Sequence, residues 1–150
     1  MIRVEKGDLL NKKYTIFCHQ VNCKGVMGSG IAKQIKNKYP EVYEEYISVE
    51  KPILGFIQPV FTRDGRICIN MFAQDGYGRD KRYTDYTAFK NCLTALKGFI
   101  NDHHVKAEVP VAFPYMIGCG LGGGDWYLIY GILKDFAKTI NNDVVVAYKE

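Results

Sequence analysis

The sequence lacks the features that mark several classes of protein. No apolar run approaches the roughly 18 residues that a membrane-spanning helix requires, and the N-terminus has no apolar core of signal-peptide length. The five cysteines are an odd number and contain no Cys-x-x-Cys pair, so neither a disulfide framework nor a zinc site is encoded locally. No dense Lys/Arg block for nucleic-acid binding is present. We expect a soluble, cytoplasmic protein with reduced thiols, no metal, no cofactor and no membrane partner.

Length and composition favour one globular domain over residues 1–150. The chain has 150 residues, of which 47% are hydrophobic and 24% charged. A domain of this size buries roughly two thirds of the surface that its unfolded chain exposes, so it needs no disulfide or metal to fold. The formal net charge of +4 is a modest excess that leaves small anionic ligands open.

Hydrophobic periodicity separates strands from helices along the chain. Strands are predicted at residues 2–5, 15–21, 53–61, 67–73, 109–116 and 143–148, and helices at 29–39, 40–47, 84–101 and 129–140. Residues 63–65 read as the turn of a hairpin, and Thr84 or Asp85 as a helix cap. The alternation predicts an α/β fold, a three-layer α/β/α sandwich with a mixed central sheet whose ligands lie beyond the carboxyl ends of the strands.

Two glycine-rich loops, residues 22–32 and 117–126, each join an apolar strand to a helix. Glycine permits positive φ and close backbone approach, and successive N–H groups at a helix start form an anion-binding nest. Two such loops facing each other would clamp a pyrophosphate. The alternative is that these glycines only make tight turns. Neither loop has the spacing of the dinucleotide-binding or P-loop motifs.

Three motifs, in this order, resemble those of the macrodomain, an ADP-ribose-binding fold. They are Gly7-Asp8-Leu9; Val21-Asn22-Cys23 followed by Gly28-Ser29-Gly30-Ile31-Ala32; and Pro114-x-x-Ile117-Gly118-Cys119-Gly120-Leu121 followed by Trp126. The likeness spans nearly the whole chain. It is closest to the short subgroup that includes terminal ADP-ribose protein glycohydrolase and yeast ADP-ribose-1''-phosphate phosphatase.

The resemblance implies ADP-ribose or a derivative as the ligand, with an ADP-ribosylated macromolecule open as a further partner. It implies that Asp8 accepts a hydrogen bond from the adenine amino group and that residues 28–31 lie on the pyrophosphate. Asn22 and residues 117–124 would approach the distal ribose. The ligand-binding residues expected on this basis are Asp8, Leu9, Asn22, Val26, Met27, Gly28, Ser29, Gly30, Ile31, Gln74, Pro114, Ile117, Gly118, Cys119, Gly120, Leu121, Gly122, Gly123 and Gly124.

The sequence departs from the glycohydrolase pattern at two positions. The human glycohydrolase of this subgroup works with a lysine and an aspartate, and the antitoxin macrodomains that act on DNA also rely on the lysine. The best ungapped match places Gln74 and Gly122 at these two positions. Glutamine cannot form the lysine's Schiff-base type adduct, and glycine offers no proton acceptor. Lys81 and Arg82 reach the site only if the segment 74–83 folds over it.

The catalytic candidates are Asp125 and His19. Asp125 lies at the end of the second glycine loop, where it could activate water; the alternative is a helix N-cap. His19 could act as acid or base, with a hydrogen-bonded structural histidine as the alternative. Cys119 has no base adjacent in sequence, which favours a small buried thiol over a nucleophile. The segment 74–86 is either a lid over the ligand or an exposed loop.

These observations lead us to expect a hydrolase acting on ADP-ribose derivatives, of the ADP-ribose-1''-phosphate phosphatase type. The alternatives are a non-catalytic module that binds ADP-ribose or cyclic ADP-ribose, and an ADP-ribosyl-protein or ADP-ribosyl-DNA hydrolase with a non-standard site.

Overall fold

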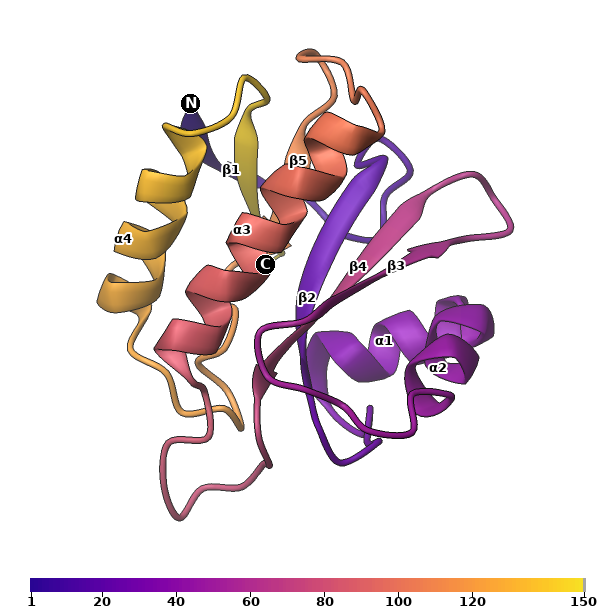
Figure 1. Ribbon diagram of the computed structural model, residues 1–150, viewed down its shortest axis with the longest axis vertical. Coiled ribbons are helices and arrows are strands. Elements are labelled where there is room, and N and C mark those ends of the chain that lie inside the picture. Colours follow the sequence, from indigo (N-terminus) through magenta and orange to yellow (C-terminus); the bar gives the residue numbers. More distant parts are fainter. Residues whose placement is uncertain (150) are drawn as a thin grey trace.

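The structure is a computed structural model that describes residues 1–149, and it places one six-stranded sheet between two pairs of helices (Figure 1). The elements follow one another as β1 (Ile2–Lys6), β2 (Ile16–Asn22), α1 (Gly30–Lys38), α2 (Pro40–Ile47), β3 (Ile57–Phe61), β4 (Ile67–Gln74), α3 (Tyr86–Asp102), β5 (Val111–Pro114), α4 (Trp126–Ala137) and β6 (Val144–Tyr148). The predicted α/β fold with a mixed sheet is confirmed.

The strand order is β1-β6-β5-β2-β4-β3. All neighbouring pairs are parallel except β3 and β4, which form the predicted hairpin. Its turn contains Gly65 at φ +85, a left-handed conformation that favours glycine. Five strands therefore run in one direction, and their carboxyl ends meet at one edge of the molecule.

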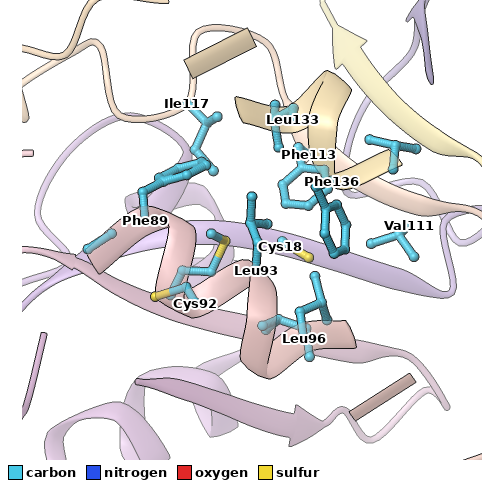
Figure 2. Close-up of a cluster of buried hydrophobic side chains, with 14 of the residues drawn as sticks. Cys18, Phe89, Cys92, Leu93, Leu96, Val111, Phe113, Ile117, Leu133 and Phe136 are labelled. Atoms are coloured by element: carbon cyan, nitrogen blue, oxygen red, sulfur yellow. The ribbon is translucent and has the colours of Figure 1, made fainter. Parts of the chain in front are cut away.

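Alternating side chains of the strands supply two separate cores. Along β2, Ile16 and Cys18 face α3 and α4, whereas Phe17 and Val21 face α1 and α2. Figure 2 shows the first core, in which α3 side chains such as Phe89 and Leu96 pack against Val111 and Phe113 of β5 and against α4. Both faces of the sheet are covered, which explains why the central strands are continuously apolar.

Two adjacent parallel strands send their helices to opposite faces of the sheet. The chain leaves β2 for α1 on one face, while it leaves the neighbouring β5 for α4 on the other. The loops after these two strands diverge there, and a crevice opens at such a switch point in α/β sheets. The two glycine-rich loops are the segments that diverge.

Two predicted strands are longer than the observed ones. The strand predicted from residue 53 begins at Ile57, because Gly55 adopts φ +94 and its N–H bonds Phe72 O across a turn. The strand predicted over 109–116 covers only Val111–Pro114. It ends there because Met116 turns the chain at φ +64. Within residues 1–149, no helix is long and apolar enough to cross a membrane.

Candidate functional site

The first glycine loop, residues 22–32, runs into the start of α1 and is shaped by Asn22 at the end of β2. The Asn22 side chain accepts from Lys24 N (2.9 Å) and donates to Val26 O (2.9 Å). The Tyr46 hydroxyl of α2 contacts Asn22 Oδ1 at 2.7 Å and accepts from Val26 N at 3.1 Å. Asn22 is 7% exposed, so its side chain holds the loop rather than facing open solvent. Met27 is also buried, whereas Val26 is exposed.

Helix α1 begins without a cap. Ser29 occupies the N-cap position but makes no side-chain cap hydrogen bond, and Gly30 has φ +57. Among residues 1–149, the backbone N–H groups of Gly28, Ser29, Gly30 and Ile31 have no acceptor. Unsatisfied N–H groups at a helix N-terminus, together with the helix dipole, form an anion-binding site. A phosphate oxygen would supply the missing acceptors.

The second glycine loop, residues 117–125, is folded on itself. Gly124 N donates to Gly118 O (2.8 Å) and Gly123 N donates to Gly120 O (3.0 Å). Ile117, 4% exposed, anchors the start of the loop in the core between α3 and α4 (Figure 2). Within the described chain the N–H groups of Gly120, Leu121 and Gly122 have no acceptor. This loop therefore offers a second, smaller set of donors.

The segment after β4 lies against the second glycine loop. Gly122 O accepts from both Tyr83 N and Thr84 N at 2.8 Å. A side chain on Gly123 would lie 3.2 Å from Arg82 Cα. The basic side chains Arg79, Lys81 and Arg82 of this segment are exposed. The segment therefore borders the second glycine loop, and Lys81 and Arg82 lie at that contact.

Gln74, which the sequence resemblance aligns with a glycohydrolase lysine, is 8% exposed. Its Oε1 accepts from Gln20 Nε2 (2.9 Å), and its Nε2 donates to Gly76 O (2.6 Å). This position is therefore uncharged and occupied by hydrogen bonds within the protein. Local patterns in the sequence did not reveal Gln20 as its partner.

The predicted adenine residues lie in the loop that follows β1. Asp8 accepts from Leu10 N (2.9 Å) and pairs with Lys149 Nζ at 3.2 Å. The Leu10 hydrogen bond and the ammonium group of Lys149 lower the pKa of Asp8, while partial burial opposes them. Asp8 is half-exposed and ionised, which suits an acceptor for an exocyclic amino group. Leu9 beside it is buried.

Arg66 at the start of β4 holds this loop in place, and sequence reasoning missed it. Its guanidinium is 2% exposed and donates to the carbonyls of Leu9 (2.7 Å), Leu10 (3.1 Å) and Tyr14 (2.8 and 3.0 Å). It also lies over the ring of Phe17 at 3.9 Å. No signal near Arg66 in sequence points to a loop more than fifty residues away, so only the fold reveals this contact.

The catalytic candidates have unequal surroundings. Asp125 is exposed at the start of α4, and its Oδ1 caps the helix by accepting from Tyr127 N (2.9 Å). His19 is completely buried and shares a hydrogen bond with Asn70 Oδ1. Burial lowers the pKa of His19 to about 4, so the ring is neutral at pH 7. This geometry favours the structural alternative for His19.

Cys119 is a half-buried thiol. Its Sγ contacts Ile117 O at 3.5 Å, and burial raises its pKa to about 11. A thiol with a raised pKa is a poor nucleophile at neutral pH. Among residues 1–149, no group of three or more His, Cys, Asp or Glu side chains could hold a metal ion.

Comparison of the sequence with known proteins gives full-length and partial matches. No protein-family model matches the chain. An uncharacterized 17.5 kDa protein of Enterobacteria phage T4 is 28% identical, covering 97% of this chain and 96% of that protein. ADP-ribose 1''-phosphate phosphatase of Saccharomyces cerevisiae is 29% identical, covering 91% and 93%. A stretch of 46 residues is 48% identical to DNA ADP-ribosyl glycohydrolase of Mycobacterium tuberculosis, but spans only 13% of that protein.

Comparison of the fold with solved structures gives matches along the whole chain. The macrodomain of Mycobacterium tuberculosis DarG superposes with a TM-score of 0.84 at 28% identity, covering 99% of this chain and 97% of that one. Thermosipho africanus DarTG in complex with ADP-ribose gives a TM-score of 0.81 at 18% identity, covering 99% and 41%. At the lower identity, the likeness concerns the fold alone.

Proposed function

This chain is a macrodomain in its fold and in its sequence motifs, and from that premise we propose that it binds ADP-ribose and hydrolyses a derivative of it. The derivative we propose is the 1''-phosphate, with ADP-ribose and inorganic phosphate as products. A full-length relative, the yeast ADP-ribose 1''-phosphate phosphatase, supports this choice. The five free cysteines fit action in the reducing cytoplasm.

The observation that carries the proposal is the set of unpaired backbone donors at the switch point of the sheet. The N–H groups of residues 28–31 follow β2, and those of Gly120, Leu121 and Gly122 follow the adjacent β5. Such groups bind anionic oxygen well, because no rearrangement is needed to expose them. A pyrophosphate joined to a ribose places anionic and hydroxyl oxygens within reach of both sets.

We assign the ligand's parts by the chemistry of each region. Asp8 accepts a hydrogen bond from the adenine amino group, the uncapped start of α1 holds the pyrophosphate, and the second glycine loop faces the distal ribose. Asp125, beside that loop, takes a proton from the attacking water. The water oxygen bonds to phosphorus, the bond from phosphorus to the ribosyl oxygen breaks, and the proton that Asp125 has taken passes to that oxygen, which leaves as a hydroxyl group.

A second candidate is a binding module without turnover. It is favoured by the neutral hydrogen-bonded state of Gln74 and by the absence of a side chain at Gly122, the two positions where the family's glycohydrolases carry their reactive groups. The same observation makes removal of ADP-ribose from DNA or protein a weaker candidate, although relatives are named DNA ADP-ribosyl glycohydrolases.

Calorimetry with ADP-ribose tests binding. We expect Asp8→Ala to weaken it by about 10- to 150-fold, the equivalent of a lost charge-assisted hydrogen bond of about 1.5 to 3 kcal/mol. Asp8→Asn is the matched control, because an amide oxygen can still accept from Leu10 N. Folded wild-type protein that gives no heat at millimolar ADP-ribose would exclude the proposed ligand.

Phosphate release from ADP-ribose-1''-phosphate tests turnover. Asp125→Asn keeps an oxygen to cap α4 but cannot take a proton, so we expect binding to remain and release to fall. Mono-ADP-ribosylated protein and ADP-ribosylated DNA are incubated in parallel. Wild-type protein that binds ADP-ribose but releases nothing from any of the three would establish the binding module.

A further inference from the structure

We propose that Thr84 is a positioning residue for the second glycine loop, and that it fixes the loop's free N–H groups in the orientation that receives the distal part of the ligand. This inference rests on the proposed function for the identity of the ligand. The geometry behind it is independent of that identity, because it consists of hydrogen bonds within the protein.

Thr84 directs its hydroxyl and its backbone N–H toward this loop and toward β2. Its hydroxyl donates to Gly118 O (2.7 Å), and its backbone N–H donates to Gly122 O (2.8 Å). The same hydroxyl oxygen accepts from Gln20 Nε2 (2.9 Å). Thr84 is 1% exposed, so these bonds are shielded from water.

Gln20, in β2, connects Thr84 to the central sheet. Its amide group also donates to Gln74 Oε1 at 2.9 Å. Gln74 and Thr84 are paired in an isolated antiparallel bridge, so the network joins β2, the end of β4 and the segment after it to the second loop. None of the three side chains carries a charge, and none belongs to the loop that they hold.

The network leaves no room for a side chain at two glycines of the loop. A Cβ on Gly122 would collide with the Thr84 hydroxyl and lie 3.0 Å from Gln20 Nε2. A Cβ on Gly118 would lie 3.0 Å from Gln20 Oε1 and 3.4 Å from Thr84 Oγ1. Gly120, by contrast, has open space around the position of a Cβ. The loop is therefore packed on its Thr84 side and open at Gly120.

This arrangement prepares the loop for binding. Because the carbonyls of Gly118 and Gly122 are turned toward Thr84, the path of the chain between them is fixed and includes the unpaired N–H groups of Gly120 and Leu121. A glycine-rich segment has a high conformational entropy when free, and ordering it during binding weakens affinity. Thr84 removes that loss by ordering the loop beforehand.

The test compares Thr84→Val with Thr84→Ser in full-length protein, using ADP-ribose and AMP as probes. Valine keeps the shape but removes the hydroxyl, and serine retains it. AMP has adenosine and one phosphate but no distal ribose. We expect Thr84→Val to weaken the affinity for ADP-ribose at least about tenfold, equivalent to about 1.4 kcal/mol. The affinity for AMP should fall less than about twofold. Thr84→Ser should remain within about threefold of wild type for both.

Equal weakening of both probes by Thr84→Val, or a serine variant as poor as valine, would overturn the proposal. Should the valine variant fail to fold, Gln20→Met offers a second test. It removes the hydrogen bond from Gln20 to Thr84 but leaves the bond from the Thr84 hydroxyl to Gly118 O. We expect it to weaken ADP-ribose binding more than AMP binding, by a smaller factor than Thr84→Val. Selectivity unchanged in Gln20→Met would likewise overturn it.

A second readout needs no ligand and so separates this inference from the proposed function. Amide hydrogen exchange of Gly124, whose N–H is bonded to Gly118 O, should be at least about tenfold faster in Thr84→Val than in wild type. Faster exchange in a protein that does not bind ADP-ribose would support positioning and reject the ligand. Unchanged exchange would reject positioning whatever the ligand.

Discussion

The two glycine-rich loops have similar compositions, but their glycines differ in how closely the rest of the protein surrounds them. In the first loop, Gly25 and Gly30 have positive φ and nothing within 4 Å of a Cβ, so glycine is needed for backbone conformation and for access. In the second, Gly122 and Gly124 would bring a Cβ against the protein itself, so glycine is needed for packing. Gly118 and Gly123 of the second loop also have positive φ, but only Gly120 has the open surroundings seen in the first loop.

The helices that follow these loops differ in the same way. Helix α1 has no side-chain cap, whereas Asp125 caps α4. The first loop therefore leaves the N–H groups at the start of α1 open to a ligand, whereas at the start of α4 the Asp125 side chain already accepts from Tyr127 N. A glycine cluster before a helix is thus not by itself an anion site; the absence of a cap is the more informative signal.

The largest expected effect is on binding at the first loop. We expect Gly30→Val to weaken the affinity for ADP-ribose by more than about a hundredfold. A branched side chain there blocks several N–H donors, whose bonds to an anion contribute about 1.5 to 3 kcal/mol each. Gly65→Val is the matched control, since Gly65 also has positive φ and open surroundings but lies in the β3–β4 turn. Calorimetry and thermal denaturation on both variants separate blocked access from backbone strain. Retained affinity in Gly30→Val would mean that the first loop is only a turn.

The next effect concerns packing in the second loop. Gly122→Ala should lower the free energy of unfolding by about 1 to 3 kcal/mol, because the added methyl group displaces the Thr84 hydroxyl and the loop with it. Gly120→Ala should change it by less than about 0.5 kcal/mol. Urea denaturation measures both values. Equal stabilities would show that the two loops do not differ as described.

A smaller effect separates the two helix starts. Asp125→Ala should cost about 1 kcal/mol of unfolding free energy, as expected for the loss of a side-chain N-cap, whereas Ser29→Ala should change it by less than about 0.5 kcal/mol because Ser29 makes no cap bond. Thermal denaturation without ligand measures the loss of stability in each of the two variants. Similar losses in the two variants would indicate that Ser29 caps α1 in solution.

The sequence allowed the order of strands and helices to be predicted because periodicity and glycine breaks are local signals. The mixed sheet, the hairpin and the Asp85 cap of α3 are confirmed. The early start predicted for β3 was wrong, since periodicity at residues 53–56 did not register the turn at Gly55. The predicted end of β5 at residue 116 was also wrong, because Met116 adopts a left-handed backbone conformation that periodicity does not register.

The parts of the candidate site that sequence reasoning missed are all long-range contacts. Arg66 holds the loop of Asp8. Thr84 bonds Gly118 of the second glycine loop across 34 residues, and Gln20 bonds Thr84 across 64 residues. No local pattern encodes such pairings. Whether a glycine is open or packed depends likewise on neighbours supplied by other strands, so the composition of the two loops did not distinguish them.

The most direct test is an NMR titration of ¹⁵N-glycine-labelled protein with ADP-ribose, which follows all 15 glycine amides at once. We expect the resonances of Gly28, Gly30, Gly120 and Gly122 to shift as their N–H groups gain acceptors. Those of Gly65 and Gly131, away from both loops, should stay in place. Shifts confined to the second loop, or none at saturating ADP-ribose, would contradict the assignment of the uncapped start of α1 as the pyrophosphate site.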